Sequence, residues 1–257
     1  GAEAMKILVV NPNTTSGMTD RIAAAARAVA SRGTTIIAVN PADGPVSIEG
    51  YYDEAHCLPG LLEEVRRGAD QGGDATIIAC FDDPGLDAAR TIAPGPVIGI
   101  CEAAMRLAPM VAGRFSVVTT LARSIPVIEH LALRYGLERQ CRRVRAADIP
   151  VLALEETGGA AAQRVRTEVE RAVAEDGAEA VILGCAGMAD LAAWLTRETG
   201  VPVIDGVAAA IKLAESLVGL GLKTSRVGGY AAPLPKPYRG RSAAFAPSPT
   251  RFAQVAP

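Results

Sequence analysis

Two stretches of the chain, ADQGGDATIIAC at 69–80 and AEDGAEAVILGC at 174–185, share one pattern at a spacing of 105 residues and decide the fold class. Each begins with small and acidic residues, continues as a short apolar run and ends at a cysteine. The same spacing separates ADGPV at 42–46 from ADIPV at 147–151. A repeat distance that recurs along a chain indicates a duplicated unit. We therefore expect two halves of similar structure.

Short Val- and Ile-rich runs alternate with longer Ala-rich stretches of helical period in both halves. The expected strands are 6–11, 35–40, 75–80, 96–100, 115–119, 149–153, 179–184 and 202–205. The expected helices are 15–31, 53–68, 84–92, 101–112, 122–135, 159–175, 186–198 and 206–220. Continuous apolar strands are typical of parallel sheets covered on both faces. The pattern predicts an α/β fold of two pseudo-symmetric halves, each a four-stranded, mostly parallel sheet flanked by helices, with the active site in the cleft between them.

The repeat divides the chain into an N-terminal α/β half at 5–112, a C-terminal α/β half at 113–222 and a tail at 223–257. The boundary between the halves is soft, because the last helix of the first half could pack on the other half. The tail is rich in Pro, Gly, Ala and Ser and has no apolar period. Such a composition predicts a solvated, disordered appendage.

The composition excludes several classes of function. The net charge is −2 with both signs interspersed, so there is no basic surface for a nucleic-acid partner. No apolar stretch is long enough to span a membrane and the start lacks the features of a secretory signal, so we expect a cytoplasmic protein without a membrane partner. Five cysteines without CxxC spacing are expected to be reduced thiols. The only histidines, His56 and His130, are far apart in the sequence and form no metal-binding motif, so we expect no metal.

Cys80 and Cys185 each follow a predicted strand and precede a predicted helix. Small ligands bind at the carboxyl ends of parallel strands, so both thiols are expected at the cleft. A helix start favours the thiolate through its unpaired N–H groups, which predicts a lowered pKa. A single cysteine at a strand end is more often a small buried hydrophobe. Two at repeat-equivalent strand ends favour the catalytic interpretation, and we interpret Cys57, Cys101 and Cys141 as structural.

Polar residues and a loop follow other strands of the two halves. NPNTT at 11–15 comes after the first strand, and FSVVTT at 115–120 ends at nearly the equivalent position. These residues also suit turns and caps, but polarity in both halves indicates groups facing one cleft. The loop at 42–53 would either lie over the cleft and supply part of a side-chain pocket, or form a surface turn on which Tyr51 and Tyr52 pack as a small cluster. The candidate substrate-binding residues from these segments are Asn13, Pro45, Val46, Ser47, Thr119 and Thr120.

Over residues 5–222 the chain closely resembles the hydantoin racemases of the aspartate/glutamate racemase superfamily. The segments that carry the resemblance are NPNTTSGMT (11–19), AVNPADGPVSIEG (38–50), IACFDDPGLDAAR (78–90), RFSVVTTLARS (114–124) and LGCAGMADL (183–191). The resemblance implies a pseudo-symmetric α/β fold, no cofactor and a homo-oligomer. It also implies that Cys80 and Cys185 act as opposed acid and base.

The residues after each cysteine differ from those of the amino-acid racemases in this superfamily. Those enzymes typically have Asn-Thr or Asn-Ser after the first cysteine and Thr after the second, whereas this chain has FDD at 81–83 and AGM at 186–188. The groups expected to meet an α-ammonium and an α-carboxylate are thus replaced, and the residues directly after the two cysteines, Phe81 and Ala186, are apolar. A neutral cyclic ureide needs hydrogen bonds rather than ion pairs, so we expect a small-molecule cyclic ureide as substrate. Its further contacts would be Phe81, Asp82, Ala186 and Gly187.

The expected reaction is the cofactor-independent inversion of C5 in 5-monosubstituted hydantoins by proton transfer between two cysteines. One alternative is an allantoin racemase of purine catabolism, whose substrate is a hydantoin with a 5-ureido group. Another is a one-cysteine decarboxylase or maleate-type isomerase of the same superfamily. A two-lobed binding module without activity would have no reason to place two thiols symmetrically.

Overall fold

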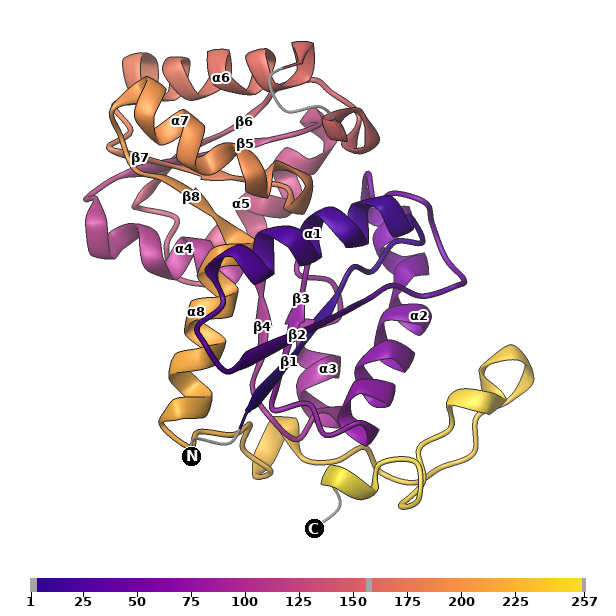
Figure 1. The fold of residues 1–257 in the computed structure, drawn as a ribbon. Helices are drawn as coiled ribbons and strands as arrows, with labels where there is room; N and C mark the ends of the chain where they lie inside the picture. The colour runs from indigo at the N-terminus through magenta and orange to yellow at the C-terminus, as the bar shows by residue number, and fades with distance from the viewer. Residues whose placement is uncertain (1–3, 156–158, 256–257) are drawn as a thin grey trace.

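The computed structural model describes residues 4–155 and 159–255, which form two lobes, each built on a four-stranded sheet (Figure 1). The strand order is β2-β1-β3-β4 in one sheet and β6-β5-β7-β8 in the other, and all neighbouring strands are parallel. The strands are β1 (Met5–Val10), β2 (Thr34–Val39), β3 (Ala75–Ile78), β4 (Val97–Gly99), β5 (Phe115–Thr119), β6 (Cys141–Ala146), β7 (Ala180–Leu183) and β8 (Val203–Asp205). The same order in both sheets confirms the predicted α/β fold of two equivalent halves.

Helices cover both faces of each sheet. The α-helices are α1 (Ser16–Val29), α2 (Tyr51–Asp70), α3 (Leu86–Ile92), α4 (Ile100–Val111), α5 (Ile125–Arg134), α6 (Ala160–Asp176), α7 (Ala192–Thr199) and α8 (Gly206–Gly219). The 3₁₀ turns are η1 (Ala122–Ser124), η2 (Val151–Glu155), η3 (Ala186–Leu191), η4 (Gly228–Tyr230), η5 (Gly240–Phe245) and η6 (Ala253–Val255). The largest apolar core lies between the two sheets and includes side chains of α1, α4, α5 and α8. None of the described helices is both long and apolar enough to cross a membrane.

The last helices of the two halves are exchanged between the sheets. α4, which follows β4 of the first sheet, packs against β7 and β8 of the second. α8, which follows β8, packs against β1, β3 and β4 of the first sheet (Figure 1). Their first residues meet at the centre of the molecule, where a Cβ on Gly206 would lie 2.6 Å from the carbonyl oxygen of Ile100. The sequence halves at 5–112 and 113–222 are therefore interlocked in space.

One strand was placed wrongly by the apolar pattern. The edge strand is β6, with the sequence CRRVRA, and the apolar segment expected as a strand at 149–153 is not a strand, since residues 149–150 precede η2 and residues 151–153 belong to it. Arg145 of β6 is buried and donates to Asp176 at 2.6 Å and to Glu175 at 2.7 Å. The carboxylates at the end of α6 pair with the Arg145 guanidinium, so its charge can be buried in this strand. The strand therefore lacks the apolar pattern from which the other strands were predicted.

The tail, which its composition predicts to be solvated and disordered, is mostly exposed and makes several contacts with the N-terminal lobe. Arg226 donates to the carbonyl oxygens of Arg90 (3.0 Å) and Ala93, and the Thr224 hydroxyl donates to Gly95 (2.9 Å). Farther on, Phe252 packs against the apolar cluster beneath α2 and α3. The tail thus runs along the outer face of the N-terminal lobe (the yellow segment in Figure 1), held by groups that no local apolar period reveals.

Candidate active site

Cys80 is placed by the end of β3. The Ala79 amide still donates to the Val10 carbonyl of β1 at 2.8 Å, so Cys80 is the first residue beyond the ladder. The chain then turns back, with the Asp83 amide donating to the Cys80 carbonyl at 3.0 Å. This turn directs the Cys80 side chain to the carboxyl edge of the sheet, where ligands bind in parallel α/β folds.

Cys185 occupies the equivalent place in the second sheet. The Gly184 amide donates to the Val118 carbonyl of β5 at 2.7 Å, which is the counterpart of the Ala79 bond. Cys185 is then the residue before η3, and its carbonyl accepts the Met188 amide at 3.1 Å. Cys80 and Cys185 therefore follow equivalent strands, β3 and β7, and each comes directly after the last residue that bonds to the neighbouring strand.

The two cysteines line one pocket between the lobes. The predicted site residues that line it are Asn13, Cys80, Phe81, Asp82, Thr119, Thr120, Cys185 and Ala186. Residues outside the set of candidate site residues that also line it are Asn11, Met18, Ile48, Ala79, Ser124, Val151 and Gly184.

Four predicted binding residues lie outside this lining. Val46 is 61% exposed, and its carbonyl accepts the Thr15 hydroxyl at 2.7 Å. The Pro45 carbonyl likewise accepts the Thr14 amide, Ser47 is half-buried, and Gly187 is buried beneath the Cys185 sulfur. The loop therefore faces the cavity with the next apolar residue, which is Ile48.

Val151 could have been found from the repeat, because it is the counterpart of Val46. Its amide donates to Glu49 Oε1 at 3.0 Å, and this bond joins the loop after β2 to η2 of the opposite lobe. Ile48 and Val151 thus face the cavity from two equivalent loops that touch each other. Their relative position depends on how the lobes meet, which the linear pattern does not encode.

Two buried asparagines shape the cavity wall. Asn13 Oδ1 accepts the Asn11 side-chain amide at 2.8 Å and the Thr15 backbone amide at 2.9 Å. Its own amide nitrogen donates to the Met18 sulfur at 3.2 Å. Because both bonds to Oδ1 fix the orientation of the Asn13 amide, its second N–H group is preorganised to donate to a ligand oxygen.

The chain matches the Asp/Glu/Hydantoin racemase family profile over residues 7–214. This chain belongs to that family. A hydantoin racemase of Rhizobium meliloti is 56% identical over 229 residues, which cover 89% of this chain and 95% of the relative. One from a Pseudomonas species (strain NS671) is 49% identical, with 92% of this chain and 95% of the relative covered. The family and these relatives make this chain an isomerase, a racemase.

Solved structures agree with the family assignment. An allantoin racemase from Klebsiella pneumoniae superposes with a TM-score of 0.92 at 53% identity, covering 95% of this chain and all of the other. A glutamate racemase from Francisella tularensis superposes with a TM-score of 0.60 at 19% identity, covering 86% of this chain and 84% of the other. The second likeness shows the shared fold alone.

The pKa values of Cys80 and Cys185 are raised, whereas the sequence predicted that they would be lowered. Burial raises the pKa of Cys185 to about 11 and raises that of Cys80 well above its usual value, and the charge of Asp82 adds to both shifts. The amide of the residue two positions on, Asp82 or Gly187, donates to each sulfur and opposes the rise. Arg21 further lowers the pKa of Cys185. Desolvation by the surrounding lobes outweighs the helix-start effect, although both cysteines keep some exposed surface.

Asp82 is a second titratable group at the cavity. It is 8% exposed, and its Oδ2 is buried without a hydrogen-bond partner among the described residues, as is Oε2 of Glu54. Burial first, then the charges of Glu54 and Asp83, raise the pKa of Asp82 to about 7. A carboxyl with a pKa of about 7 is partly protonated at neutral pH and can both donate and accept hydrogen bonds. Asp82 therefore suits a ligand with both N–H and C=O groups. In residues 4–155 and 159–255, no cluster of His, Cys, Asp or Glu is arranged to hold a metal ion.

Proposed function

We propose that this racemase inverts C5 of 5-monosubstituted hydantoins by a two-base proton transfer between Cys80 and Cys185. The observation that carries the proposal is the placement of two thiols at equivalent strand ends on one cavity. A ring held between them would present opposite faces of C5 to the two sulfurs. The curated hydantoin racemases, at 43–56% identity, support the substrate class.

The chemistry follows from the acidity of C5, whose carbanion is delocalised onto the neighbouring carbonyl as an enolate. One cysteine, as thiolate, takes the C5 proton and becomes a thiol, while the other thiol gives its proton to the opposite face and becomes the thiolate. Proton count and charge are unchanged, and the roles exchange for the other enantiomer.

The cavity lining suits a neutral ring. Among the described residues that line it, Asn, Thr and Ser supply hydrogen bonds and none carries a positive charge. A free amino acid would bring an α-carboxylate that needs such a charge. The ring N–H and C=O groups of a hydantoin need only donors and acceptors, which Asn13 and Asp82 offer.

Allantoin racemisation is a second candidate. Allantoin is a hydantoin with a 5-ureido group, and allantoin racemases from Klebsiella pneumoniae and Pseudomonas fluorescens are 53% and 44% identical to this chain. Asp82 and Ser124 at the cavity wall could bind the ureido group. Polarimetry with single enantiomers of allantoin, 5-benzylhydantoin and 5-isobutylhydantoin separates the candidates, because allantoin alone would lose its rotation if the ureido group were required.

The two-base mechanism predicts that Cys80→Ser and Cys185→Ser each abolish racemisation. A serine hydroxyl is far too weak an acid to replace a thiol, so the loss should reach at least about 10³-fold. Rotation of single hydantoin enantiomers is followed by polarimetry, and exchange of the C5 hydrogen with deuterated water by NMR. The matched control is Cys141→Ser on β6, which should keep its activity. Full activity in either active-site variant would contradict the mechanism.

A further inference from the structure

The helices exchanged between the lobes begin in the same way but are capped from different places. The N-cap of α8 is Asp205, whose carboxylate accepts the amides of Val207 at 3.0 Å and Ala208 at 2.8 Å. The equivalent position before α4 is Gly99, which has no side chain to accept such bonds. The backbone at Gly99 (φ −82°, ψ 143°) resembles that at Asp205 (φ −91°, ψ 130°), so an aspartate cap would fit there.

In α4 the missing cap is supplied by Asp83, from the turn that carries Cys80. Asp83 Oδ1 accepts the Cys101 amide at 3.1 Å, and Oδ2 accepts the Glu102 amide at 2.9 Å. A Cβ on Gly99 would lie 2.2 Å from Oδ1 of Asp83, so glycine is needed to admit the carboxylate. Asp83 thus accepts the amides of the second and third residues of α4, the same two positions whose amides Asp205 accepts in α8.

This cap joins the Cys80 turn to the opposite lobe. Asp83 is buried, has a positive φ of 45°, and donates its own amide to the Cys80 carbonyl at 3.0 Å. Oδ2 also accepts the Tyr135 hydroxyl, which follows α5, at 2.5 Å. Because α4 packs on β7 and β8, one carboxylate links the turn after β3 to the lobe that carries Cys185.

We propose that Asp83 is a positioning residue for racemisation, which holds the Cys80 turn at a set distance from the lobe that carries Cys185. The proposal rests on the proposed two-cysteine reaction. Proton transfer to opposite faces of one carbon needs both sulfurs at fixed positions, and a misplacement of about 1 Å can cost roughly 100-fold in rate. A cap supplied locally, as in α8, would stabilise the helix equally but would leave the Cys80 turn unattached.

The first test is Asp83→Asn, which keeps the side-chain size but replaces one acceptor oxygen with an amide. We expect kcat for 5-benzylhydantoin to fall about 100-fold with KM nearly unchanged, because ring binding survives while sulfur alignment does not. Since a lost cap also lowers stability, the melting temperature is measured in parallel. An unchanged kcat in the folded variant would overturn the proposal.

The decisive test transplants the cap. In the double variant Asp83→Gly, Gly99→Asp, the glycine accepts the positive φ and the new aspartate reproduces the α8 arrangement. We expect melting near that of the wild type, with kcat still reduced about 100-fold. If Asp83 were only a helix cap, kcat would return together with stability, and the proposal would fail.

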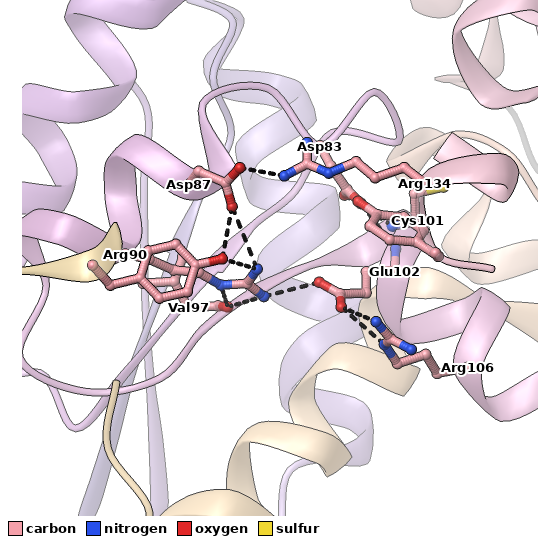
Figure 2. A network of polar contacts seen from close by, with 10 residues as sticks. Asp83, Asp87, Arg90, Val97, Cys101, Glu102, Arg106 and Arg134 are labelled. Atoms are coloured by element: carbon pink, nitrogen blue, oxygen red, sulfur yellow. Dashed lines mark hydrogen bonds and ion pairs between the residues drawn. The ribbon is translucent and has the colours of Figure 1, made fainter. Parts of the chain in front are cut away.

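The matched control is Asp87→Asn. Asp87 also links the N-terminal lobe to α5, through Arg134, but this contact is on the surface (Figure 2). Its loss should leave kcat within about twofold.

A readout independent of turnover separates this proposal from the proposed function. Bridging of Cys80 and Cys185 by a short bifunctional alkylating reagent is measured by peptide mass spectrometry. We expect the bridged yield to fall in the double variant and to be unchanged in Asp87→Asn. If the wild type bridges but racemises no hydantoin, the substrate assignment fails while the positioning role stands. Equal bridging in the wild type and the double variant would overturn the positioning role.

Discussion

At the scale of single residues, the surroundings of Asp82 disfavour its charged form and so lower the stability of the folded protein at neutral pH. Its carboxyl is buried, one of its oxygens has no partner among the described residues, and two other carboxyls lie near it. Each of these conditions disfavours the charged form, and together they raise its pKa to about 7 from an ordinary value of 3.8. Such unsatisfied groups cluster at functional sites, where they can bind a ligand.

Asp82→Asn is expected to stabilise the protein in a pH-dependent way. The folded state favours the protonated carboxyl, so the stability that this group provides is complete below about pH 4 and is lost as the pH rises to about 7. The neutral amide avoids that loss, so the free energy of unfolding should rise by about 1–3 kcal/mol at pH 8 and hardly change at pH 4. Urea denaturation at both pH values measures this, with Asp20→Asn on the exposed face of α1 as control. Equal gains at both pH values would show that the pKa of Asp82 is not raised.

At the scale of elements, the tail completes α3, the short helix after the Cys80 turn. α3 ends with carbonyl groups that have no partner within the helix, and the Arg226 guanidinium donates to those of Arg90 and Ala93. Tyr230 of the tail adds a bond from its hydroxyl to Asp87 at 2.9 Å. The tail therefore acts as a C-terminal cap for α3, supplied from far along the chain.

Arg226→Ala should lower the free energy of unfolding by about 1–3 kcal/mol, because buried carbonyl groups lose a charged donor. Urea denaturation followed by circular dichroism measures the change. Arg239→Ala, at an exposed position of the same tail, is the matched control and should have little effect. Equal stability of the two variants would mean that the tail is solvated, as its composition predicts.

At the scale of the whole molecule, the exchange of α4 and α8 makes the two halves depend on each other. Glu215 of α8 accepts the Ser31 amide at 2.7 Å and the Thr34 hydroxyl at 2.8 Å, which fastens the helix to the N-terminal lobe. These bonds and Lys212 hold the pKa of Glu215 at about 2 despite burial. A chain cut at the sequence boundary would leave an apolar face of each exchanged helix uncovered.

We expect that fragments 5–112 and 113–222, expressed separately, do not fold. Each lacks the helix that covers the inner face of its sheet, so the apolar burial lost exceeds the few kcal/mol by which domains are stable. Circular dichroism and urea titration of each fragment, and of their mixture, measure this. Cooperative unfolding of an isolated fragment would contradict it, whereas recovery of the unfolding transition on mixing would support it.

The duplication, the parallel strands and the position of both cysteines at strand ends could all be predicted from the sequence. These features depend on local patterns, since an apolar run long enough for one buried strand and a repeat spacing are both visible in the linear chain. The prediction that Asn13, Thr119 and Thr120 follow equivalent strands used the same information. All three line the cavity.

The remaining features were decided by tertiary structure alone. β6 is stabilised by acidic partners from α6, and the tail by its contacts with the end of α3. The start of α4 is stabilised by a carboxylate from the Cys80 turn. No local sequence pattern predicts these partners. The pKa of each thiol depends on how completely the lobes exclude water, and burial reversed the shift expected from the helix starts. Sequence by itself thus determined which elements form and where the thiols sit along the chain. How far the two thiols are apart and how readily they ionise depend on contacts between residues distant in sequence, which exist only once the lobes are packed together.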